Sequence, residues 1–573
     1  MFVFDCEVFK YNWLFVFKKV STGEYTIILD NDEELKRFYE ENQKALFIGY
    51  NNKAYDNIIF KGILSNVNPA EITRMIIGGK QRYLVQKVLG IKDFKLTTMD
   101  LMQDILGMSL KEAEGYMCMS IEESDVDFDI DRPLTKEEIE KTIFYCKHDV
   151  DATEKLLEKR SGYVKSKLNL VKMFNLNPSN LEATNAKLCA TVLEATRKSH
   201  DDELIYDLPD ELVLNKQEYK DILKLYTNGL LDYTKKIKVD VGGVTHLFAY
   251  GGLHGAIENF FYKGEMWQID AASYYPTLMI QYNYMSRNLK NPRKFKEIYD
   301  DRIAAKKTNK PKADALKLMI NTAYGAMKSE YNDMYDAKMA NQVCITGQLF
   351  LTDLIEKIEP YCKLVQSNTD GILIIPYDKD KILEEVHKVE ERTRVNFEID
   401  KCSGVWQKDV NNYIMSFEDG HVKTKGAYVT QYNDSNFNIR NTGKILDIAV
   451  VDYFVKGIHP IDTIMNCNDK YMFQLITKTG GSYTATYWKS SVGDIKVNKV
   501  NRVYASKDSN QGNLYKTKIV EKNEVKTIRK DSIANLPEHC VVDNGDKINI
   551  EDIDKNWYVQ VALKRIADFE GGN

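Results

Sequence analysis

The chain has 573 residues, 43% of them hydrophobic and 28% charged, and its formal net charge is −5. This length exceeds what one hydrophobic core supports, so several domains are expected, and the composition excludes wholesale disorder. No apolar run is long enough to span a membrane, and nine cysteines without a CxxC pair exclude structural zinc, iron–sulfur clusters and a disulfide framework. A protein of a reducing cytosol is expected, without a signal peptide because Asp5 and Glu7 interrupt the apolar start.

The first stretch of the chain is predicted to be a strand that carries two carboxylates. Phe2 to Phe4 are apolar, and Asp5 and Glu7 follow two residues apart, so both point to one face of the strand. Taken alone, this stretch fits a solvated edge strand equally well.

Two later stretches supply more acids that local structure would bring together. Residues 48–56 change from a strand pattern to a helix pattern, which puts Asp56 near a helix start. Tyr145 and Asp149 lie four residues apart in a helical stretch and share a face. Four carboxylates with no obvious basic partner are typical of a metal-dependent phosphodiesterase, because cations offset their repulsion and activate a water that Tyr145 would orient. Scattered surface acids are the alternative.

The middle of the chain begins with a predicted helical connector over residues 165–240. Ser179 and Glu182 form a capping box ahead of a helix that is expected to end near Leu193. Most charges of this connector are expected to be solvated.

Two acids in the second half are predicted to meet in space. Asp270 ends a strand-like run, and Asp370 stands at the turn of a predicted hairpin over residues 364–375. An acid at the end of a buried strand is costly unless something pairs with it. We therefore predict that Asp270 and Asp370 together hold two Mg²⁺ ions for nucleotidyl transfer.

Residues 292–327 are predicted to form two helices joined near Asn309. On the first helix, Arg302 and Lys306 are four residues apart and share a face. The second helix carries a polar stripe on an otherwise apolar surface, which indicates a face toward a ligand, with a solvated stripe as the alternative. The stripe consists of Lys317, Asn321 and Tyr324.

The last part of the chain contains a locally basic run from Lys496 to Lys530, with Tyr504 and Tyr515 within it. We interpret this run as a surface that holds the backbone of duplex DNA, although a solvated charged surface fits almost as well. Residues 557–569 are predicted to form an amphipathic helix that packs on this region.

Three of these motifs resemble, in the same order, those of family B DNA polymerases. Asp270-x-x-Ser273-x-Tyr275-Pro276 is similar to the first palm motif, and Lys317-x-x-x-Asn321-x-x-Tyr324-Gly325 is similar to the fingers motif. Asn368-Thr369-Asp370 resembles the Asp-Thr-Asp motif, with Asn368 in place of the first Asp. The family uses the second Asp as the direct metal ligand, which Asp370 retains.

The N-terminal acids resemble the three motifs of DEDD-type 3′–5′ proofreading exonucleases, in the subclass with Tyr in the third motif. Asn52 matches the Asn that precedes Tyr-Asp in the second motif. Ser109-Leu110 resembles the Ser/Thr-Leu element that touches the single-stranded primer end, with chance as an even alternative. Tyr250-Gly251-Gly252 is a looser match, one residue shorter, to the Tyr-x-Gly-Gly element between the two activities, and a structural turn explains it equally well.

The resemblance implies an α/β multi-domain fold, in which an RNase H-like exonuclease domain precedes a right-hand polymerase with palm, short two-helix fingers and thumb. The implied boundaries are 1–165 for the exonuclease domain, 166–245 for the helical connector, 246–285 for the first part of the palm, 286–327 for the fingers, 328–430 for the second part of the palm and 431–573 for the thumb and C-terminal domain.

The same resemblance implies roles for individual residues. Asp5, Glu7, Asp56, Asp149, Asp270 and Asp370 are expected to bind Mg²⁺, two ions in each active site, with Mn²⁺ as a substitute, and Tyr145 completes the catalytic set. Tyr275, Lys317, Asn321, Tyr324, Arg302 and Lys306 are expected to bind the nucleotide, with Tyr275 under the sugar, where it would exclude a 2′-hydroxyl. Asn52, Ser109, Leu110, Gly251, Gly252, Thr369, Tyr413 and Lys425 are expected to bind DNA, with a structural role as the alternative for Tyr413.

The expected function is template-directed DNA polymerisation with proofreading, in phage or mobile-element replication in a bacterial host cytosol. The expected partners are primer–template DNA, dNTPs and processivity or single-strand-binding proteins, and no membrane. One alternative is a 3′–5′ exonuclease with a non-catalytic, DNA-binding polymerase half, because of Asn368. The other is a primer-independent or untemplated polymerase in phage defence.

Overall fold

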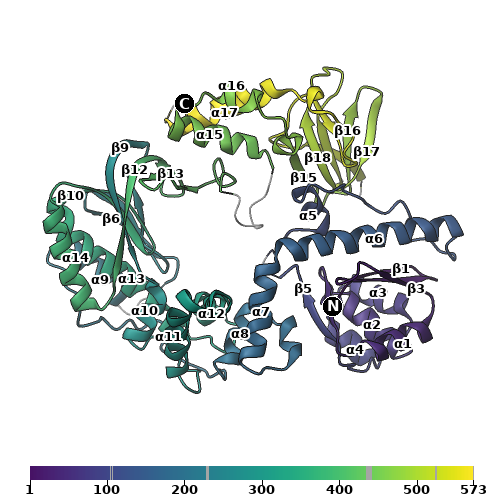
Figure 1. Cartoon of the computed structure of the whole chain (residues 1–573), viewed down its shortest axis with the longest axis horizontal. Coiled ribbons are helices and arrows are strands. Elements are labelled where there is room, and N and C mark those ends of the chain that lie inside the picture. Colours follow the sequence, from purple (N-terminus) through teal and green to yellow (C-terminus); the bar gives the residue numbers. More distant parts are fainter. Residues whose placement is uncertain (104, 106, 228–231, 434–441, 523–524, 572–573) are drawn as a thin grey trace. The chain divides into compact units, whose positions relative to one another are not determined.

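The computed structural model describes residues 1–103, 105, 107–227, 232–433, 442–522 and 525–571 (Figure 1). The chain forms two compact units, each with mixed α/β content. The first is built mainly from Met1–Glu182 and Ile464–Val559, and the second from Ala183–Ser435, Leu446–Thr463 and Gln560–Asn573. None of the described helices combines the length and the apolar character needed to cross a membrane.

Strand alternation in the first unit decides which side chains face its core. The five-stranded sheet has the order β3-β2-β1-β4-β5, with β2 antiparallel to β1 and β3, and with β1, β4 and β5 parallel. The strands are β1 (Phe2–Val8), β2 (Trp13–Lys19), β3 (Tyr25–Leu29), β4 (Leu46–Gly49) and β5 (Thr97–Asp100). Phe2, Phe4 and Cys6 of β1 pack into one core cluster, so Asp5 and Glu7 point to the opposite face.

The helices of the first unit carry the remaining acids to that face of the sheet. Helix α6 packs against β1 and β2, and Asp56 is the first residue of α2. The predicted first strand, the helix start at Asp56 and the helix through Tyr145 and Asp149 are confirmed. The helices are α1 (Asp32–Glu41), α2 (Asp56–Leu64), α3 (Pro69–Ile77), α4 (Arg82–Val88), α5 (Leu110–Tyr116), α6 (Lys136–Lys159) and α7 (Ser161–Met173).

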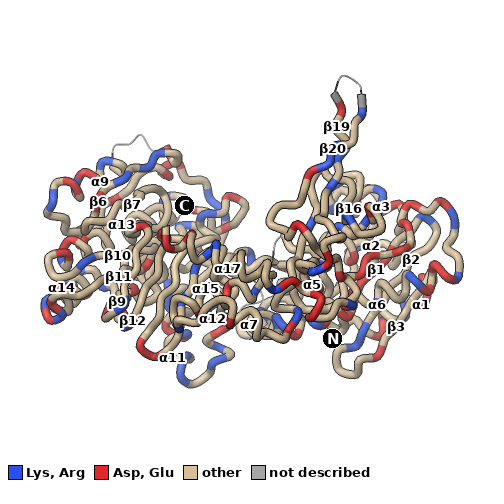
Figure 2. The backbone as a smooth tube through the Cα atoms, turned by 90° about the horizontal axis from the view of Figure 1, so that it is seen from above, with Lys and Arg blue, Asp and Glu red and all other residues tan. Residues whose placement is uncertain are grey.

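Two small sheets complete the first unit. One has the order β15-β18-β21, and the other has the order β17-β16-β19-β20, whose β19–β20 hairpin projects from the unit and carries several Lys and Arg residues (Figure 2). The strands are β15 (Leu475–Lys478), β16 (Ala485–Ser490), β17 (Gly493–Val497), β18 (Val500–Ala505), β19 (Leu514–Lys522), β20 (Val525–Ser532) and β21 (Cys540–Val542). Tyr504 is fully buried in β18, so its predicted place in the basic surface is wrong.

Helix α5 joins the N-terminal sheet region to these C-terminal sheets. Lys478 of β15 forms an ion pair of 2.6 Å with Glu112, and the Nη2 of the fully buried Arg502 donates to the carbonyl of Met119 at 2.6 Å. A Cβ atom on Gly115 would lie only 2.8 Å from the Cδ1 of Ile476. The last turn of α5 is therefore packed directly against β15.

The second unit is organised around a nine-stranded sheet whose neighbouring strands are all antiparallel. Its order is β14-β13-β12-β9-β11-β10-β8-β7-β6. The strands are β6 (Ile237–Val241), β7 (Val244–Phe248), β8 (His254–Ala256), β9 (Phe260–Ala271), β10 (Cys362–Asn368), β11 (Gly371–Pro376), β12 (Phe397–Asp409), β13 (Asn412–Phe417) and β14 (Val422–Lys425). The predicted hairpin with Asp370 at its turn is confirmed as β10–β11.

The helices of the second unit include the two predicted for residues 292–327, which are α11 and α12 and meet at Asn309. The predicted capping box at Ser179 is wrong, because 178–182 forms a 3₁₀ turn and Thr184 caps α8 instead. The helices are α8 (Asn185–Val192), α9 (Gln217–Thr227), α10 (Tyr274–Gln281), α11 (Arg293–Thr308), α12 (Lys310–Lys328), α13 (Ala337–Ile358) and α14 (Lys379–Thr393).

Helices α15 (Lys444–Lys456) and α17 (Lys555–Phe569) each cross from one unit to the other along the chain. The predicted helix is confirmed as α17, which begins two residues earlier than expected, but its C-terminal half does not pack on the C-terminal basic region as predicted. Ile566 and Phe569 pack with Phe454 of α15 and with Trp406 and Ile414 of β12 and β13. The C-terminal half of α17 therefore covers the sheet of the second unit.

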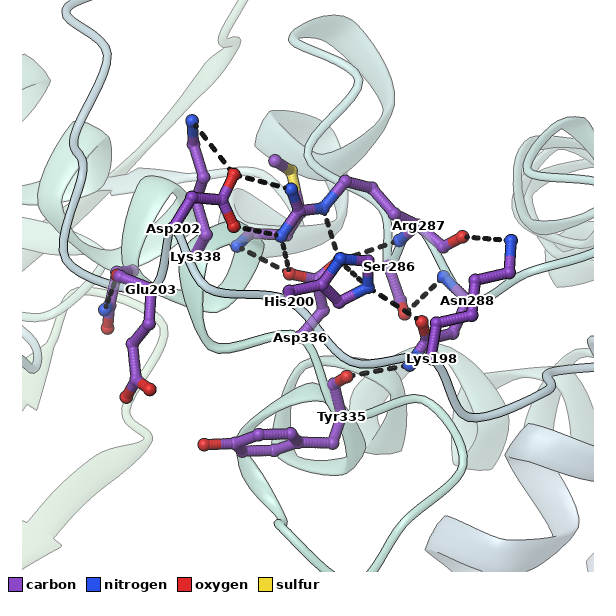
Figure 3. A network of polar contacts seen from close by, with 12 residues as sticks. Lys198, His200, Asp202, Glu203, Ser286, Arg287, Asn288, Tyr335, Asp336 and Lys338 are labelled. Atoms are coloured by element: carbon purple, nitrogen blue, oxygen red, sulfur yellow. Dashed lines mark hydrogen bonds and ion pairs between the residues drawn. The ribbon is translucent and has the colours of Figure 1, made fainter.

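An ion-pair network ties the segment after α8 to the start of α13 (Figure 3). The guanidinium of Arg287 lies between Asp202 and Asp336, with Nη1 2.7 Å from Asp202 and Nη2 2.8 Å from Asp336. Asp336 is buried and also accepts from the backbone N–H of Met339, so it caps α13. These ion pairs fix the start of α13, the helix that contacts α10 and α12.

Because α5 packs against β15, replacing a glycine by valine should destabilise α5 more than it destabilises an exposed helix. Gly115→Val should lower the free energy of unfolding of the first unit by about 1–3 kcal/mol, because the new side chain collides with Ile476. Gly162→Val, at an exposed glycine of α7 with open space around it, should change it by less than about 0.5 kcal/mol. Urea unfolding followed by circular dichroism measures both, and equal effects would contradict the packing described for α5.

Candidate active sites

Four carboxylates of the first unit gather beside β1. Asp5 and Glu7 are half-buried on β1, and Asp56 and Asp149 are buried at the start of α2 and in α6. The backbone N–H of Cys6 donates to the Oδ1 of Asp56 at 3.1 Å, which fixes Asp56 next to the strand. Carboxylate oxygens of Asp5 and Glu7 and the Sγ of Cys146 lie within 4.8 Å of one another. Asp5 and Asp149, which are 144 positions apart in the sequence, therefore belong to one acidic cluster.

The electrostatics of this cluster fit a bound cation. Burial, followed by repulsion from Asp56, raises the pKa of Asp5 well above its ordinary value, and burial, followed by repulsion from Asp149, does the same for Glu7. Burial raises the pKa of Asp56 and that of Asp149 to about 6. Acids that repel one another in a buried place, with oxygen atoms as the donors, are the ligand set that Mg²⁺ and Mn²⁺ prefer.

Lys111 is a basic partner that the sequence prediction missed. Its Nζ contacts Asp149 and lies 2.9 Å from Glu114, and it stands 4.5 Å from the ring centre of Tyr145. Although burial lowers it, the pKa of Lys111 is raised by Asp149 and Glu114. The prediction of four acids with no basic partner is therefore wrong for Asp149. The available signals were the position directly after Ser109-Leu110 and the i,i+3 spacing to Glu114.

Tyr145 lies where its hydroxyl group remains a proton donor. Burial, followed by the carboxylates of Asp149 and Glu7, raises the pKa of Tyr145 far above its ordinary value. A phenol that stays protonated at neutral pH can donate a hydrogen bond to a water or a phosphate oxygen beside the acids.

The three residues expected to hold the primer end lie in two different settings. Asn52 is fully buried, its Nδ2 donates to Asn57 at 3.0 Å, and its Oδ1 has no hydrogen-bond partner among the described residues. Ser109 caps α5 in a reciprocal capping box with Glu112, and Ser109 and Leu110 are both half-buried. Their contact with DNA stays a prediction.

Asp270 and Asp370 are brought to adjacent places in the second unit. Gly371 pairs with Asp270 across β11 and β9, and the backbone N–H of Ala271 donates to the carbonyl of Asp370 at 2.7 Å. A Cβ atom on Gly371 would lie 1.7 Å from the Oδ1 of Asp270, so only glycine leaves room for that carboxylate. The tight turn between β10 and β11 requires a positive φ of 47° at Thr369.

Charge at this edge of the sheet also fits a cation. Burial, followed by repulsion from Asp270, raises the pKa of Asp370, while Lys423 and Lys425 act in the opposite direction. Glu398 of β12 pairs with Asp270 in register, so a third carboxylate, missed by the sequence prediction, shares this face. Burial, followed by Lys423, lowers the pKa of Lys425. The arrangement offers hard oxygen donors beside two lysines that suit phosphate.

The residues around Asp370 pack as a supporting shell. Asn368 of β10 pairs in register with His254 of β8, and Tyr413 is buried in the core cluster beneath this end of the strands. A Cβ atom on Gly252 would lie 2.4 Å from the Oγ1 of Thr369, so this glycine allows a close approach to the turn. Among the described residues, no atom lies within 4 Å of the Cβ position of Gly251. Gly252 therefore allows the close packing of the turn that presents Asp370.

The expected nucleotide-binding residues fall on and around α12. Lys317 and Asn321 are exposed and Tyr324 is half-buried, opposite the buried Leu316 and Ile320. The rings of Tyr275 and Tyr324 lie 4.6 Å apart at 58°. Burial, followed by Cys344 and Asp370, raises the pKa of Tyr275.

The two expected residues of α11 differ in setting. Arg302 is buried, whereas Lys306 is exposed. The structure therefore brings Tyr275 and Tyr324 together, and it leaves the joint action of Arg302 and Lys306 on a nucleotide as a prediction.

Comparison with known proteins gives partial matches to DNA polymerases. The chain is 26% identical to DNA polymerase 1 of Aeropyrum pernix over 210 residues, which cover 30% of this chain and 22% of that protein. It is 26% identical to DNA polymerase 1 of Sulfolobus acidocaldarius over 130 residues, which cover 22% of this chain and 14% of that protein. No family model matches the chain.

Among solved structures, the chain matches the family B DNA polymerase from the hyperthermophilic archaeon Pyrobaculum calidifontis. The match covers 99% of this chain and 77% of that chain, with a TM-score of 0.42 and 13% identity. This chain spans less than a quarter of the length of the two curated relatives it matches. Over these parts of its length, the chain is similar to archaeal DNA polymerases.

The raised pKa values predict how pH and metal act on the first unit. Without metal, Asp56 and Asp149 bind more protons in the folded protein than in the unfolded chain between about pH 4 and pH 6, so the stability that these two groups contribute should fall as the pH rises through that window. Mn²⁺ at about 100 times its dissociation constant should add about 2.7 kcal/mol at pH 7.5, and much less at pH 5, because its ligands must be deprotonated.

Thermal unfolding with and without Mn²⁺ at the two pH values measures both effects. Asp5→Asn is the variant in which the metal effect should shrink, and Glu40→Gln, at an exposed acid of α1, is its control. A metal effect that is the same in Asp5→Asn and in the parent protein would contradict a cation site at this cluster.

Proposed function

We propose that the chain is a template-directed DNA polymerase of the family B type with a 3′–5′ proofreading exonuclease. The observation that carries this proposal is the register pairing of Gly371 with Asp270, which sets Asp370 and Asp270 side by side at the edge of an antiparallel sheet. The ring of Tyr275 packs against the ring of Tyr324 on α12, and Asp370 contributes to the raised pKa of Tyr275. A nucleotide bound between the acids and α12 would meet both rings. The similarity to archaeal DNA polymerases supports the same function.

In the polymerase site, Asp270 and Asp370 would hold divalent cations, with Glu398 as a further candidate ligand. Such ions activate the attacking 3′-oxygen and stabilise the charge on the leaving pyrophosphate. Lys317 would bind the triphosphate and Tyr324 would pack against the new base pair, with Asn321, Arg302 and Lys306 as further nucleotide contacts. Lys425 and Thr369 would contact the primer strand.

In the exonuclease site, Asp5, Glu7, Asp56 and Asp149 would hold the cations that activate a water. The hydroxyl of Tyr145 would orient that water, and Lys111 would hold Asp149 in place and offset the repulsion between the acids. Ser109, Leu110 and Asn52 would position the primer end. The RNase H-like assignment of this region and the domain boundaries given above are part of the proposal.

The outer face of the β16–β19 sheet is the candidate surface for duplex DNA. The rings of Tyr487 and Tyr515 stack at 5.3 Å, and Lys489 and Lys530 lie 5.9 Å and 4.8 Å from the ring centre of Tyr515. Because the rings are already stacked on each other, the lysines rather than the aromatic faces would contact DNA, through its phosphates. Like Tyr504, Tyr515 is buried, at 6% exposure, so neither predicted tyrosine is exposed in this surface, and the half-buried Tyr487 stacks on Tyr515.

A second candidate function is a 3′–5′ exonuclease whose polymerase half binds DNA without extending it. The observation in its favour is Asn368, an amide where the resemblance expects a carboxylate. Short two-helix fingers favour replication of a phage or mobile element in a bacterial cytosol as the setting.

The two sites predict opposite effects of two substitutions. Asp370→Ala should lower primer extension by more than about a hundredfold and leave digestion unchanged, and Asp5→Ala should do the reverse, because each removes a cation ligand from one site. The measurement is a gel assay with a labelled primer–template and Mg²⁺, with and without dNTPs. Asp380→Ala and Glu40→Ala, at exposed acids, are the controls.

Each outcome of that assay separates the candidates. Extension that follows the template supports the polymerase, shortening alone supports the exonuclease, and product without primer or template supports an untemplated polymerase. Loss of both activities in either folded variant would contradict the assignment of two sites.

The place of Tyr275 beside Asp370 predicts selection of the sugar. Tyr275→Val should raise incorporation of ribonucleotides relative to deoxynucleotides by about 10–200-fold, because the ring no longer meets the 2′-hydroxyl. Single-nucleotide incorporation with matched dNTP and rNTP measures the ratio, with Tyr282→Val as a control at another half-buried Tyr of the same region. An unchanged ratio in an active Tyr275→Val enzyme would show that Tyr275 does not contact the sugar.

A further inference from the structure

Residues 74–95 form a basic segment that none of the proposed roles uses. They include six basic residues and one acidic residue, in a chain whose formal net charge is −5. The segment contains the end of α3, all of α4 and the connections on either side. Its basic residues are Arg74, Lys80, Arg82, Lys87, Lys92 and Lys95.

Most of this positive charge is not neutralised within the protein. Asp93, the acid of the segment, pairs with Lys61 at 2.6 Å, outside the segment, and Arg74 pairs with Glu71 at 3.7 Å. In the described part of the chain, the other five basic side chains have no carboxylate partner, and all five residues are exposed. Such a concentration of unpaired cations attracts a polyanion.

The same segment exposes large apolar side chains. Ile77 at the end of α3 is 79% exposed, and Tyr83 and Val88 of α4 are 61% and 65% exposed, although Val85 of α4 is fully buried. Tyr83 and Lys87 are four residues apart and lie on the face of α4 opposite Val85, so an aromatic ring and an ammonium group stand next to each other in solvent. A cluster of exposed apolar groups on a soluble domain marks a binding surface more often than a plain surface.

The segment contacts residues that lie next to the acidic cluster of the first unit. The guanidinium of Arg82 donates to the carbonyl of Lys53, three residues before Asp56. Helix α4 also contacts α2, whose first residue is Asp56. A strand bound along α4 would therefore lie next to the loop that presents Asp56.

We propose that this α4 patch, defined by Lys80, Arg82, Tyr83, Lys87 and Val88, binds single-stranded DNA and leads its 3′ end toward the acidic cluster. This inference rests on the proposed exonuclease. Lysines and Arg82 bind phosphates, and Tyr83 and Val88 contact unpaired bases, whose flat faces are hidden in a duplex. The positive patch also offsets the repulsion that the carboxylates of Asp5, Glu7, Asp56 and Asp149 exert on an approaching strand.

The direct test is photocrosslinking of the full chain to a 20-nucleotide oligo(dT) that contains 5-iododeoxyuridine, without divalent metal so that no cleavage occurs. Trypsin cuts after Arg82 and after Lys87, so mass spectrometry should find the crosslink on the peptide 83–87. A crosslink found only elsewhere would overturn the proposal and leave an acidic protein as the partner of the patch.

The matching affinity measurement uses fluorescence anisotropy with the same oligonucleotide unmodified. The double variant Tyr83→Ala/Lys87→Glu should raise the dissociation constant by about tenfold or more and reduce the salt slope by about 0.7 for each lost phosphate contact. Tyr11→Ala/Lys44→Glu, with the same chemistry at exposed positions of the first unit, should change it by less than about twofold. Lys80→Glu, in the loop before α4, is a second variant should the first fold poorly. An unchanged dissociation constant would overturn the proposal.

Neither measurement depends on catalysis, so the patch and the exonuclease can fail separately. If the parent chain digests no DNA but the crosslink and the loss of affinity occur, the binding surface stands and the exonuclease proposal falls. If digestion is normal and the crosslink is absent, the binding surface falls and the exonuclease stands.

Discussion

Repulsion between carboxylates that are held together by the backbone is the constraint on which the rest of this protein depends. In the first unit, strand alternation turns Asp5 and Glu7 away from the aromatic core, and a hydrogen bond from Cys6 fixes Asp56 beside them. In the second unit, the register of β9 and β11 sets Asp270 and Asp370 together. Burial and neighbouring carboxylates raise the pKa of Asp5, Glu7 and Asp370, and such acids favour cations, so both clusters have the chemistry of metal sites.

The surroundings of each cluster are built to tolerate that repulsion. Gly371 leaves space for the Asp270 carboxylate, and Lys423 and Lys425 oppose the rise in the Asp370 pKa. Lys111 does the same for Asp149, and it stands on α5, whose far end is packed against β15 and β18. The C-terminal sheets therefore support the helix that carries Lys111, the basic partner of the acidic cluster. These contacts connect sequence segments that are more than 350 residues apart.

Much of the local structure could be predicted because short-range patterns determine it. Period-two alternation specified β1, the turn residues specified the β10–β11 hairpin, and helical spacing of polar residues specified α11 and α12. The residues that escaped prediction depend on long-range contacts. Tyr504 lies in a basic run and is nevertheless buried in a core. Lys111 contacts Asp149, which is 38 positions away in the sequence. Glu398 pairs with Asp270 through a strand register that no local pattern encodes. The start of α8 was misplaced because Ser179 begins a 3₁₀ turn, whereas Thr184 has the capping geometry.

Binding of Mn²⁺ followed by electron paramagnetic resonance tests the claim of two separate carboxylate centres most directly. The sample is the full chain with a dideoxy-terminated primer–template and the matching dNTP. The account predicts two independent classes of bound Mn²⁺, of which Asp370→Ala removes one and Asp5→Ala removes the other. A single class that both substitutions remove, or binding that neither substitution changes, would contradict it.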